Sequence, residues 1–95
     1  KPYKRESLFV IKVDGKSMQP VINDKALVVA DLSQTEIIDD EIYIVYHENS
    51  MWIKKAKVLK SVTTFVSINR DFSHLVYRQE NIRVVAKALL TFTSL

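Results

Sequence analysis

Ser17 has the setting that a nucleophilic serine needs. It follows a predicted strand, 8–13, and a tight turn at Asp14 and Gly15. A serine placed there has its hydroxyl lifted off the sheet, beside backbone N–H groups that can stabilise an oxyanion. Because serines after turns are common, Ser17 becomes a candidate nucleophile only if a base accompanies it.

Lys54 is the candidate base, since neither His47 nor His74 lies in a convincing position. Side chains of the predicted strand 51–58 alternate between two faces. One face carries Met51, Ile53, Lys55 and Lys57, and the other carries Trp52, Lys54, Ala56 and Val58. Lys54 is therefore the only charge on an apolar face, where loss of hydration lowers the pKa of an amine. A shift from about 10.4 to near 7 requires roughly 4–5 kcal/mol and would let Lys54 take the proton of Ser17.

Lys54 and Gly15 each have a second possible interpretation. The Lys54 side chain can instead extend past Trp52 to solvent, with its methylene groups covering the ring. Gly15 is the only glycine in the chain. It is either a simple turn residue or fills a backbone position that other residues fill badly, such as one with positive φ or a close neighbour.

The elements that would position Ser17 and Lys54 are almost all strands. Segments rich in Val, Ile, Tyr, Phe and Thr predict strands over 8–13, 26–30, 41–46, 51–58, 63–68 and 82–92. The polar linker 47–50 predicts an antiparallel hairpin between two of them. No segment sustains the pattern of an amphipathic helix, although 32–38 is compatible with a short helical turn. The sequence therefore predicts a mostly β fold of paired antiparallel strands.

Length and composition limit the class of protein. A chain of 95 residues forms one domain, and its 47% of hydrophobic residues can bury a core without metal or disulfide support. The absence of cysteine excludes a thiol nucleophile and disulfides, and two distant histidines disfavour a zinc site, so no metal or cofactor is predicted. The formal charge of +3 is too small to indicate a nucleic-acid partner by itself. Without a membrane-spanning run or a signal peptide, we expect a soluble, cytoplasmic protein with no membrane partner.

The residues around Ser17 and Lys54 resemble the LexA, UmuD and phage-repressor family of self-cleaving, S24-type peptidases. The run FVIKVDGKSMQP, residues 9–20, is similar to the family's V-x-G-x-S-M-x-P motif, which carries the nucleophile at its serine. The run WIKKA, residues 52–56, is similar to the strand that carries the family's base lysine. The separation of 37 positions between Ser17 and Lys54 is typical of the family. Further similar segments lie at 21–31, 39–46, 67–69 and 82–90.

The resemblance covers about residues 8–92 and implies a LexA-like or signal-peptidase-like β domain. It implies that Ser17 is the nucleophile and Lys54 the general base. The backbone N–H groups of Lys16 and Ser17 would be the oxyanion donors. Met18 and Pro20 would shape the turn, and Asn69 would be structural.

The sequence departs from the family's pattern at several positions. Lys16 replaces the acidic or small residue that often precedes the serine, and its charge would either help to keep Lys54 neutral or be solvated. Residues 23–25, 39–40 and 86–87 stand where the family usually has a glycine. The missing glycines do not affect Ser17 or Lys54.

The resemblance also implies a function. Domains of this family hold a transcriptional repressor as a homodimer and cut a segment of their own chain, upstream of the domain. The cut separates the domain from an N-terminal helix-turn-helix module that binds DNA. A RecA filament promotes the cut in LexA-like members, and an antirepressor protein acts on others. Since only 16 residues precede Ser17, we expect the cleavage segment and the DNA-binding module to lie outside this sequence.

Three other functions stay open. They are a non-catalytic dimerisation module of a repressor, a UmuD-like self-processing protein of SOS mutagenesis, and a small basic β-barrel that binds nucleic acid. The aromatic platform of such a barrel is not evident, because Tyr43, Trp52, Phe65 and Phe72 lie on different predicted elements.

Overall fold

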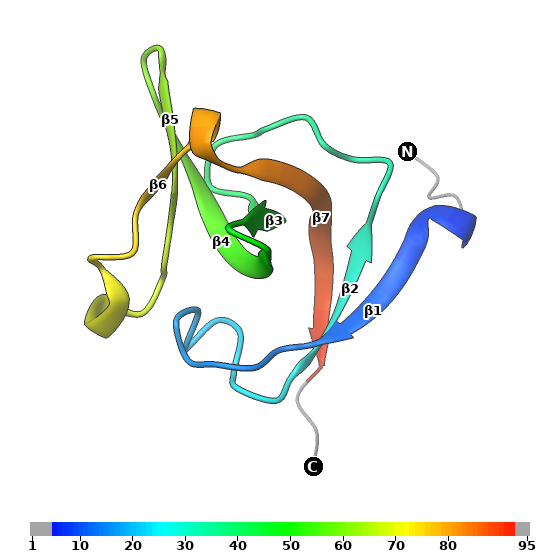
Figure 1. The fold of residues 1–95 in the computed structure, drawn as a ribbon. Coiled ribbons are helices and arrows are strands. Elements are labelled where there is room, and N and C mark those ends of the chain that lie inside the picture. Colours follow the sequence, from blue (N-terminus) through cyan, green and yellow to red (C-terminus); the bar gives the residue numbers. More distant parts are fainter. Residues whose placement is uncertain (1–4, 93–95) are drawn as a thin grey trace.

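Residues 5–92, the part of the chain that the computed structural model describes, contain seven antiparallel strands and three short 3-10 turns, joined by loops (Figure 1). The strands are β1 (Leu8–Lys12), β2 (Leu27–Asp31), β3 (Ile42–His47), β4 (Ser50–Leu59), β5 (Val62–Val66), β6 (Tyr77–Arg78) and β7 (Arg83–Phe92), and the turns are η1 (Arg5–Ser7), η2 (Arg70–Phe72) and η3 (Gln79–Asn81). One sheet holds them in the order β1-β2-β7-β3-β4-β5-β6. The predicted mostly β fold is confirmed, although the sequence pattern did not reveal the short β6. No helical turn within residues 5–92 has the length or apolar character of a membrane span.

Two tight hairpins set the register of the strands around Lys54. β3 and β4 pair antiparallel through Glu48 and Asn49, whose φ angles are 48° and 65°. Positive φ at both central residues is typical of the type I′ turns that join such strands. The predicted hairpin is therefore confirmed. β4 and β5 pair in the same way, with Leu59 opposite Val62.

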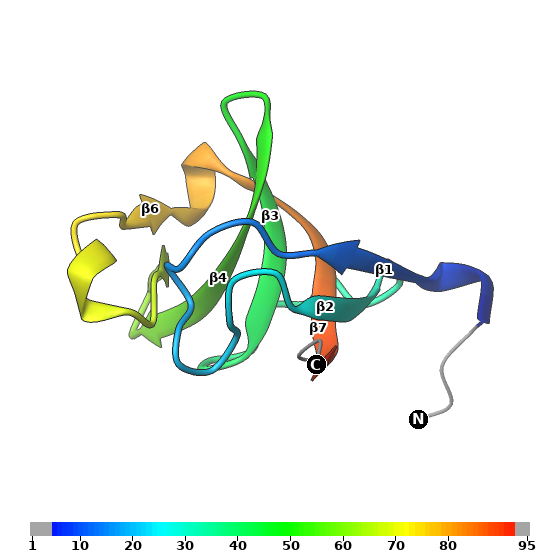
Figure 2. The ribbon, with the colours of Figure 1, turned by 90° about the horizontal axis from the view of Figure 1, so that it is seen from below.

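The chain after β1 crosses the molecule towards β4 and the segment that follows β5, as Figure 2 shows from below. There the backbone N–H of Asn69 donates to the carbonyl of Ser17 over 2.8 Å. Buried side chains of the sheet form the core: Val28, Ala30, Tyr43, Ile44, Val45, Ala56, Phe65 and Ala86. The loop between β1 and β2 adds Met18 and Ile22 to this core, which fixes the loop against the sheet.

The segment 32–38 is not helical, so the prediction of a short helical turn there is wrong. The Gln34 amide and the hydroxyl and N–H of Ser33 donate to the buried carboxylate of Asp31, which closes a turn instead. These hydrogen bonds hold the pKa of Asp31 well below its usual range. The hydroxyl of Tyr43 then bonds two backbone groups of the same segment. The polar groups of the segment are thus satisfied without helical pairing.

Within residues 5–92, positive φ angles occur at Gly15, in the turn before Ser17, and at five residues other than glycine: Lys25, Asp40, Glu48, Asn49 and Lys60. Gly15 has φ +136°, which confirms that its backbone conformation is one that other residues fill badly. Nothing lies within 4 Å of where its Cβ would be, so conformation and not crowding favours glycine there. Lys25 and Asp40 have φ of 71° and 69°, at two of the places where the resembled family usually has glycine.

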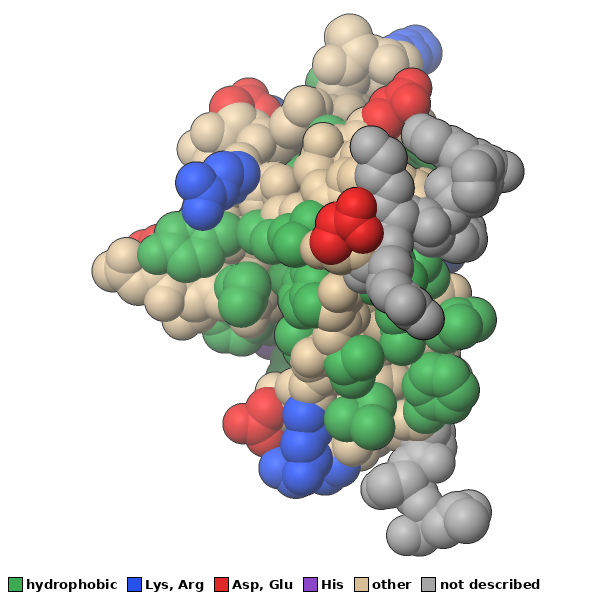
Figure 3. Space-filling model, turned by 90° about the vertical axis from the view of Figure 1, so that its right-hand side faces the viewer, with side chains coloured by type: hydrophobic (Ala, Val, Ile, Leu, Met, Phe, Trp, Pro, Cys, Tyr) green, Lys and Arg blue, Asp and Glu red, His purple; other side chains and the backbone are tan. Residues whose placement is uncertain are grey.

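The outer face of β1, β2 and β7 carries a row of apolar side chains. Val10, Val29 and Leu90 lie side by side in register, and Leu27 lies beside Phe92. Val29 is half-buried and the other four are exposed. Figure 3 shows apolar side chains gathered on this side of the molecule. We call these five residues the outer apolar row.

Candidate active site

Lys54 lies in the middle of β4 with its side chain turned into the molecule. It pairs with Tyr43 of β3, and 0% of its surface is exposed. Trp52, on the same face of the strand, keeps 39% of its surface exposed, and its ring centroid lies 5.9 Å from the Lys54 Nζ. The interpretation in which the Lys54 side chain passes Trp52 to solvent is therefore wrong.

The loop between β1 and β2 brings Ser17 to the amine of Lys54. The Lys54 Nζ lies 3.2 Å from the Ser17 Oγ and 2.8 Å from the Ser67 Oγ. Two residues 37 positions apart in the chain thus come within hydrogen-bond distance, as a serine and its base must.

The surroundings of Lys54 favour its uncharged form. Among residues 5–92, no carboxylate forms an ion pair with it. Tyr43 and Ala56, which share its face of the sheet, are both buried. Burial lowers the pKa of Lys54 below its usual 10.5, because removal from water disfavours the ammonium form. Such an amine can accept a proton from a neighbouring hydroxyl.

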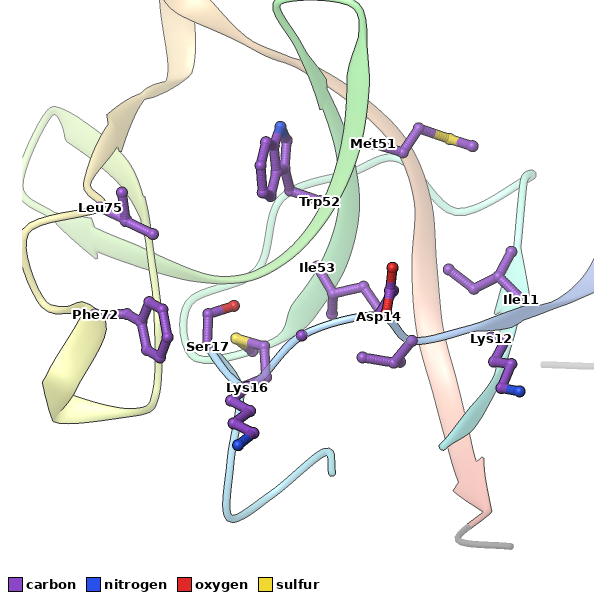
Figure 4. A pocket seen from close by; sticks show the side chains of 13 residues that line it. Ile11, Lys12, Asp14, Lys16, Ser17, Met51, Trp52, Ile53, Phe72 and Leu75 are labelled. Carbon is purple, nitrogen blue, oxygen red and sulfur yellow. The ribbon is translucent and has the colours of Figure 1, made fainter. Parts of the chain in front are cut away.

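Lys16 contributes backbone groups to the site, while its side chain is exposed and points away from Ser17 (Figure 4). Of the two interpretations of its charge, solvation fits this placement, since burial lowers the pKa of Lys54. Within residues 5–92, neither the N–H of Lys16 nor that of Ser17 donates a hydrogen bond. Both N–H groups are thus available to an oxygen of a bound molecule.

Buried side chains and hydrogen bonds fix the turn that carries Ser17. Met18 packs in the core with Ile22, whose N–H donates to the Met18 carbonyl over 2.9 Å. From the other side, the Asn69 Nδ2 donates to the Lys16 carbonyl and the Asn69 N–H to the Ser17 carbonyl, each over 2.8 Å. The Ser17 hydroxyl is therefore presented from a turn held on two sides.

Comparison with known proteins gives a family for this arrangement. Residues 2–89 match the Peptidase S24-like family. The chain belongs to this family. The resemblance to the LexA-like repressors and peptidases is thereby confirmed.

A relative of the S24-like chain is itself a regulator. Over 68 residues the chain is 34% identical to an uncharacterized HTH-type transcriptional regulator of Haemophilus influenzae. The match covers 72% of this chain and 28% of that regulator. The chain thus spans less than a third of the length of the regulator.

A cleft of about 310 Å³ opens beside Ser17 in this S24-like domain. The end of β1 and the turn after it form one wall, and the first part of β4 forms another (Figure 4). The segment between β5 and β6 supplies the third wall. The apolar side chains that line the cleft are Ile11, Val13, Met18, Met51, Trp52, Ile53, Phe72 and Leu75.

The contact between Ser67 and the amine of Lys54 in this S24-like site was not predicted from the sequence. The signal for it lies in the register of the β4–β5 hairpin. Lys55 lies opposite Val66 in that hairpin. Because the strands are antiparallel, Lys54, which precedes Lys55, lies opposite Ser67, which follows Val66. Recognition of the two-residue turn at 60–61 would have given this register in advance.

Proposed function

We propose that this S24-like domain is the self-cleaving, dimerising C-terminal part of a LexA-like or phage-type transcriptional repressor. Ser17 is its nucleophile and Lys54 its general base. The observation that carries the proposal is the buried Lys54 amine, 3.2 Å from the Ser17 hydroxyl and without an acidic partner among residues 5–92. Burial of a lysine in this way costs stability, and groups with a perturbed pKa cluster at functional sites.

In the proposed reaction, the neutral amine of Lys54 takes the proton of Ser17 as the serine oxygen attacks a peptide carbonyl. The carbonyl oxygen becomes an oxyanion, to which the N–H groups of Lys16 and Ser17 donate. The protonated Lys54 then gives its proton to the leaving amine, and the peptide bond breaks to leave an acyl ester on Ser17. Water, deprotonated by the same amine, hydrolyses the ester and restores both residues.

The substrate is an extended segment of the same protein, upstream of this sequence. Two strand edges beside the cleft support this choice. β1 is the edge strand of the sheet. In β4, pairing with β5 starts only at Lys55, so the residues up to Lys54 pair with β3 alone. A peptide in extended conformation can add its backbone hydrogen bonds to such edges.

Dimerisation is the second part of the proposal, and the outer apolar row supports it. Contiguous exposed apolar side chains of this kind mark an interface. A second copy of the domain is the occupant that a repressor requires, because two DNA-binding modules must meet two half-sites. Val10 of the row and Ile11 of the cleft point to opposite faces of β1, so pairing through the row leaves the cleft open.

The remaining partners follow from the same proposal. A helix-turn-helix module outside this sequence binds DNA, and the likeness to an HTH-type regulator supports this assignment. The repressor acts in the cytoplasm, where it meets DNA. A RecA filament or an antirepressor protein triggers the cut, and adding RecA with single-stranded DNA and ATP to the full-length protein separates the two triggers.

The proposed reaction is tested on the full-length protein at alkaline pH. We expect the wild-type protein to cut itself and Ser17→Ala to stay intact, while Ser73→Ala, an exposed control, cuts like the wild type. The rate should rise with pH as Lys54 loses its proton. Cleavage by Ser17→Ala, or a flat rate between about pH 6 and 10, would contradict the assignment. If none of the proteins cuts, the non-catalytic dimerisation module replaces the peptidase.

A further inference from the structure

The segment 67–69 touches both members of the proposed Ser–Lys pair. The Ser67 Oγ lies 2.8 Å from the Lys54 Nζ, closer than the Ser17 Oγ at 3.2 Å. Two residues further along, Asn69 bonds the carbonyls of Lys16 and Ser17. One short stretch of backbone therefore fixes the distance between the amine and the turn that carries the hydroxyl.

The contact with Ser67 decides how the amine of Lys54 can be oriented. A neutral amine has two N–H groups and one lone pair, and only the lone pair can accept the proton of Ser17. When one N–H donates to the Ser67 Oγ, rotation about the last bond of the side chain is restricted. The lone pair can then face the Ser17 hydroxyl while the amine keeps its bond to Ser67.

The contacts of Asn69 fix its side chain as well as the turn. Its Oδ1 accepts from the backbone N–H of Asp71, which caps η2. Its Nδ2 is thereby directed at the carbonyl of Lys16, to which it donates over 2.8 Å. The position of the Ser17 turn thus depends on an amide that is itself held in place.

We propose that Ser67 and Asn69 are positioning residues of the cleavage reaction. Ser67 orients the amine of Lys54 towards Ser17, and Asn69 holds the turn that presents the Ser17 hydroxyl. This inference rests on the function proposed above and extends it to two residues that lie outside the lining of the cleft.

The test measures the rate of self-cleavage of the full-length protein as a function of pH. Ser67→Ala removes the hydroxyl, and we expect a fall of about 10- to 100-fold at every pH, including the alkaline plateau where Lys54 is already neutral. Ser67→Thr keeps a hydroxyl and should stay within about fivefold of the wild type. Ser61→Ala is the matched control, an exposed serine in the turn of the same hairpin, and should cut at the wild-type rate.

Asn69→Asp tests the second contact. Aspartate keeps the oxygen that caps η2 but loses the donor to the Lys16 carbonyl, so we expect a fall of about 10-fold or more across the pH range. Asn81→Asp makes the same change at an exposed position of η3 and should leave the rate unchanged. If a variant unfolds, Ser67→Cys and Asn69→Ser replace it, because both keep a small side chain while weakening or losing the bond.

The outcomes separate this inference from the proposed function. A wild-type protein that cuts only with Ser17 and Lys54 intact, together with Ser67→Ala and Asn69→Asp at the wild-type rate, overturns the positioning roles alone. Recovery of the full rate by Ser67→Ala at high pH also overturns the role of Ser67, because it shows an effect on protonation and not on orientation. No cleavage by the wild-type protein overturns both proposals.

Discussion

Lys54 and Lys57 lie three residues apart on β4, and their surroundings are opposite. Lys54 is buried on the inner face, and its amine contacts two serine hydroxyls. Lys57 lies on the outer face, where its amine binds the carboxylate of Asp40. Burial lowers the pKa of Lys54, whereas the hydrogen bond that Lys57 donates to the carboxylate of Asp40 raises the pKa of Lys57.

The face of the strand on which a lysine lies, and not the residue type alone, decides what its amine can do. Alternation along β4 sends Lys54 inward and Lys57 outward. A carboxylate within reach keeps an amine charged, and a charged amine cannot act as a base.

The largest effect is expected from removal of the buried amine. Lys54→Met should slow self-cleavage of the full-length protein by about 10³-fold or more, because no base remains for Ser17. Lys57→Met should stay within about twofold, since exposed ion pairs contribute little. Gel-based rates at alkaline pH check both variants, and equal slowing of the two would remove the distinction between the lysines.

A smaller effect is expected when Lys54 receives an acidic partner like that of Lys57. Ser67→Asp places a carboxylate beside the amine and should raise the pKa of Lys54. The pH–rate profile then moves to higher pH, and the rate at neutral pH falls about tenfold for each unit of the shift. Ser61→Asp, in the exposed turn, serves as the control. A profile of Ser67→Asp with an unmoved inflection would argue against Lys54 as the titrating group.

The lowered pKa of Lys54 also makes stability depend on pH. The unfolded chain, with a lysine pKa of 10.5, binds more protons than the folded protein between the folded pKa and 10.5. The unfolding free energy of the wild type, compared with that of Lys54→Met, should therefore rise with pH in this window. The total rise is about 1.4 kcal/mol for each pH unit by which the folded pKa lies below 10.5. The loss of stability caused by burying the charged amine is complete below the folded pKa and absent above 10.5. Urea titrations at several pH values measure it, and a constant difference would contradict the shift.

The smallest effect concerns a third lysine of the same hairpin, Lys60, where backbone and not charge matters. Lys60 has φ of 55° in the β4–β5 turn. Lys60→Gly should raise the unfolding free energy by about 0.5 kcal/mol, because glycine adopts this conformation without strain. Lys57→Gly, within the strand, should lower it. Thermal unfolding of the two variants gives the comparison, and loss of stability in Lys60→Gly would contradict it.

The sequence predicted the strands because their signals are local. Segments rich in β-branched and aromatic residues marked six of the strands, and the polar linker at 47–50 marked the β3–β4 hairpin. The error at 32–38 has two causes. The carboxylate of Asp31 closes a local turn with Ser33, and the hydroxyl of Tyr43, from the neighbouring strand β3, bonds the backbone of the same segment. The short β6 forms only because Tyr77 and Arg78 meet β5.

The site was predictable to a different degree at each residue. Alternation in β4 and the family motif pointed to Lys54 and Ser17, and the structure brings the two side chains together. The contact of Ser67 depends on the register of a hairpin whose turn had no glycine or proline to mark it. The hydrogen bonds of Asn69 join the segment after β5 to the turn that carries Ser17, more than 50 positions away in the chain, and no local pattern contains such a contact.

The most direct test of the account is the pKa of Lys54 itself. It is measured by NMR on full-length Ser17→Ala protein with lysines labelled at the ε carbon, and Lys54→Arg in the same background assigns the signal. We expect Lys54 to titrate below 10.5 and Lys57 to titrate above it. A Lys54 signal that titrates together with the surface lysines would contradict the neutral amine on which the proposed cleavage depends.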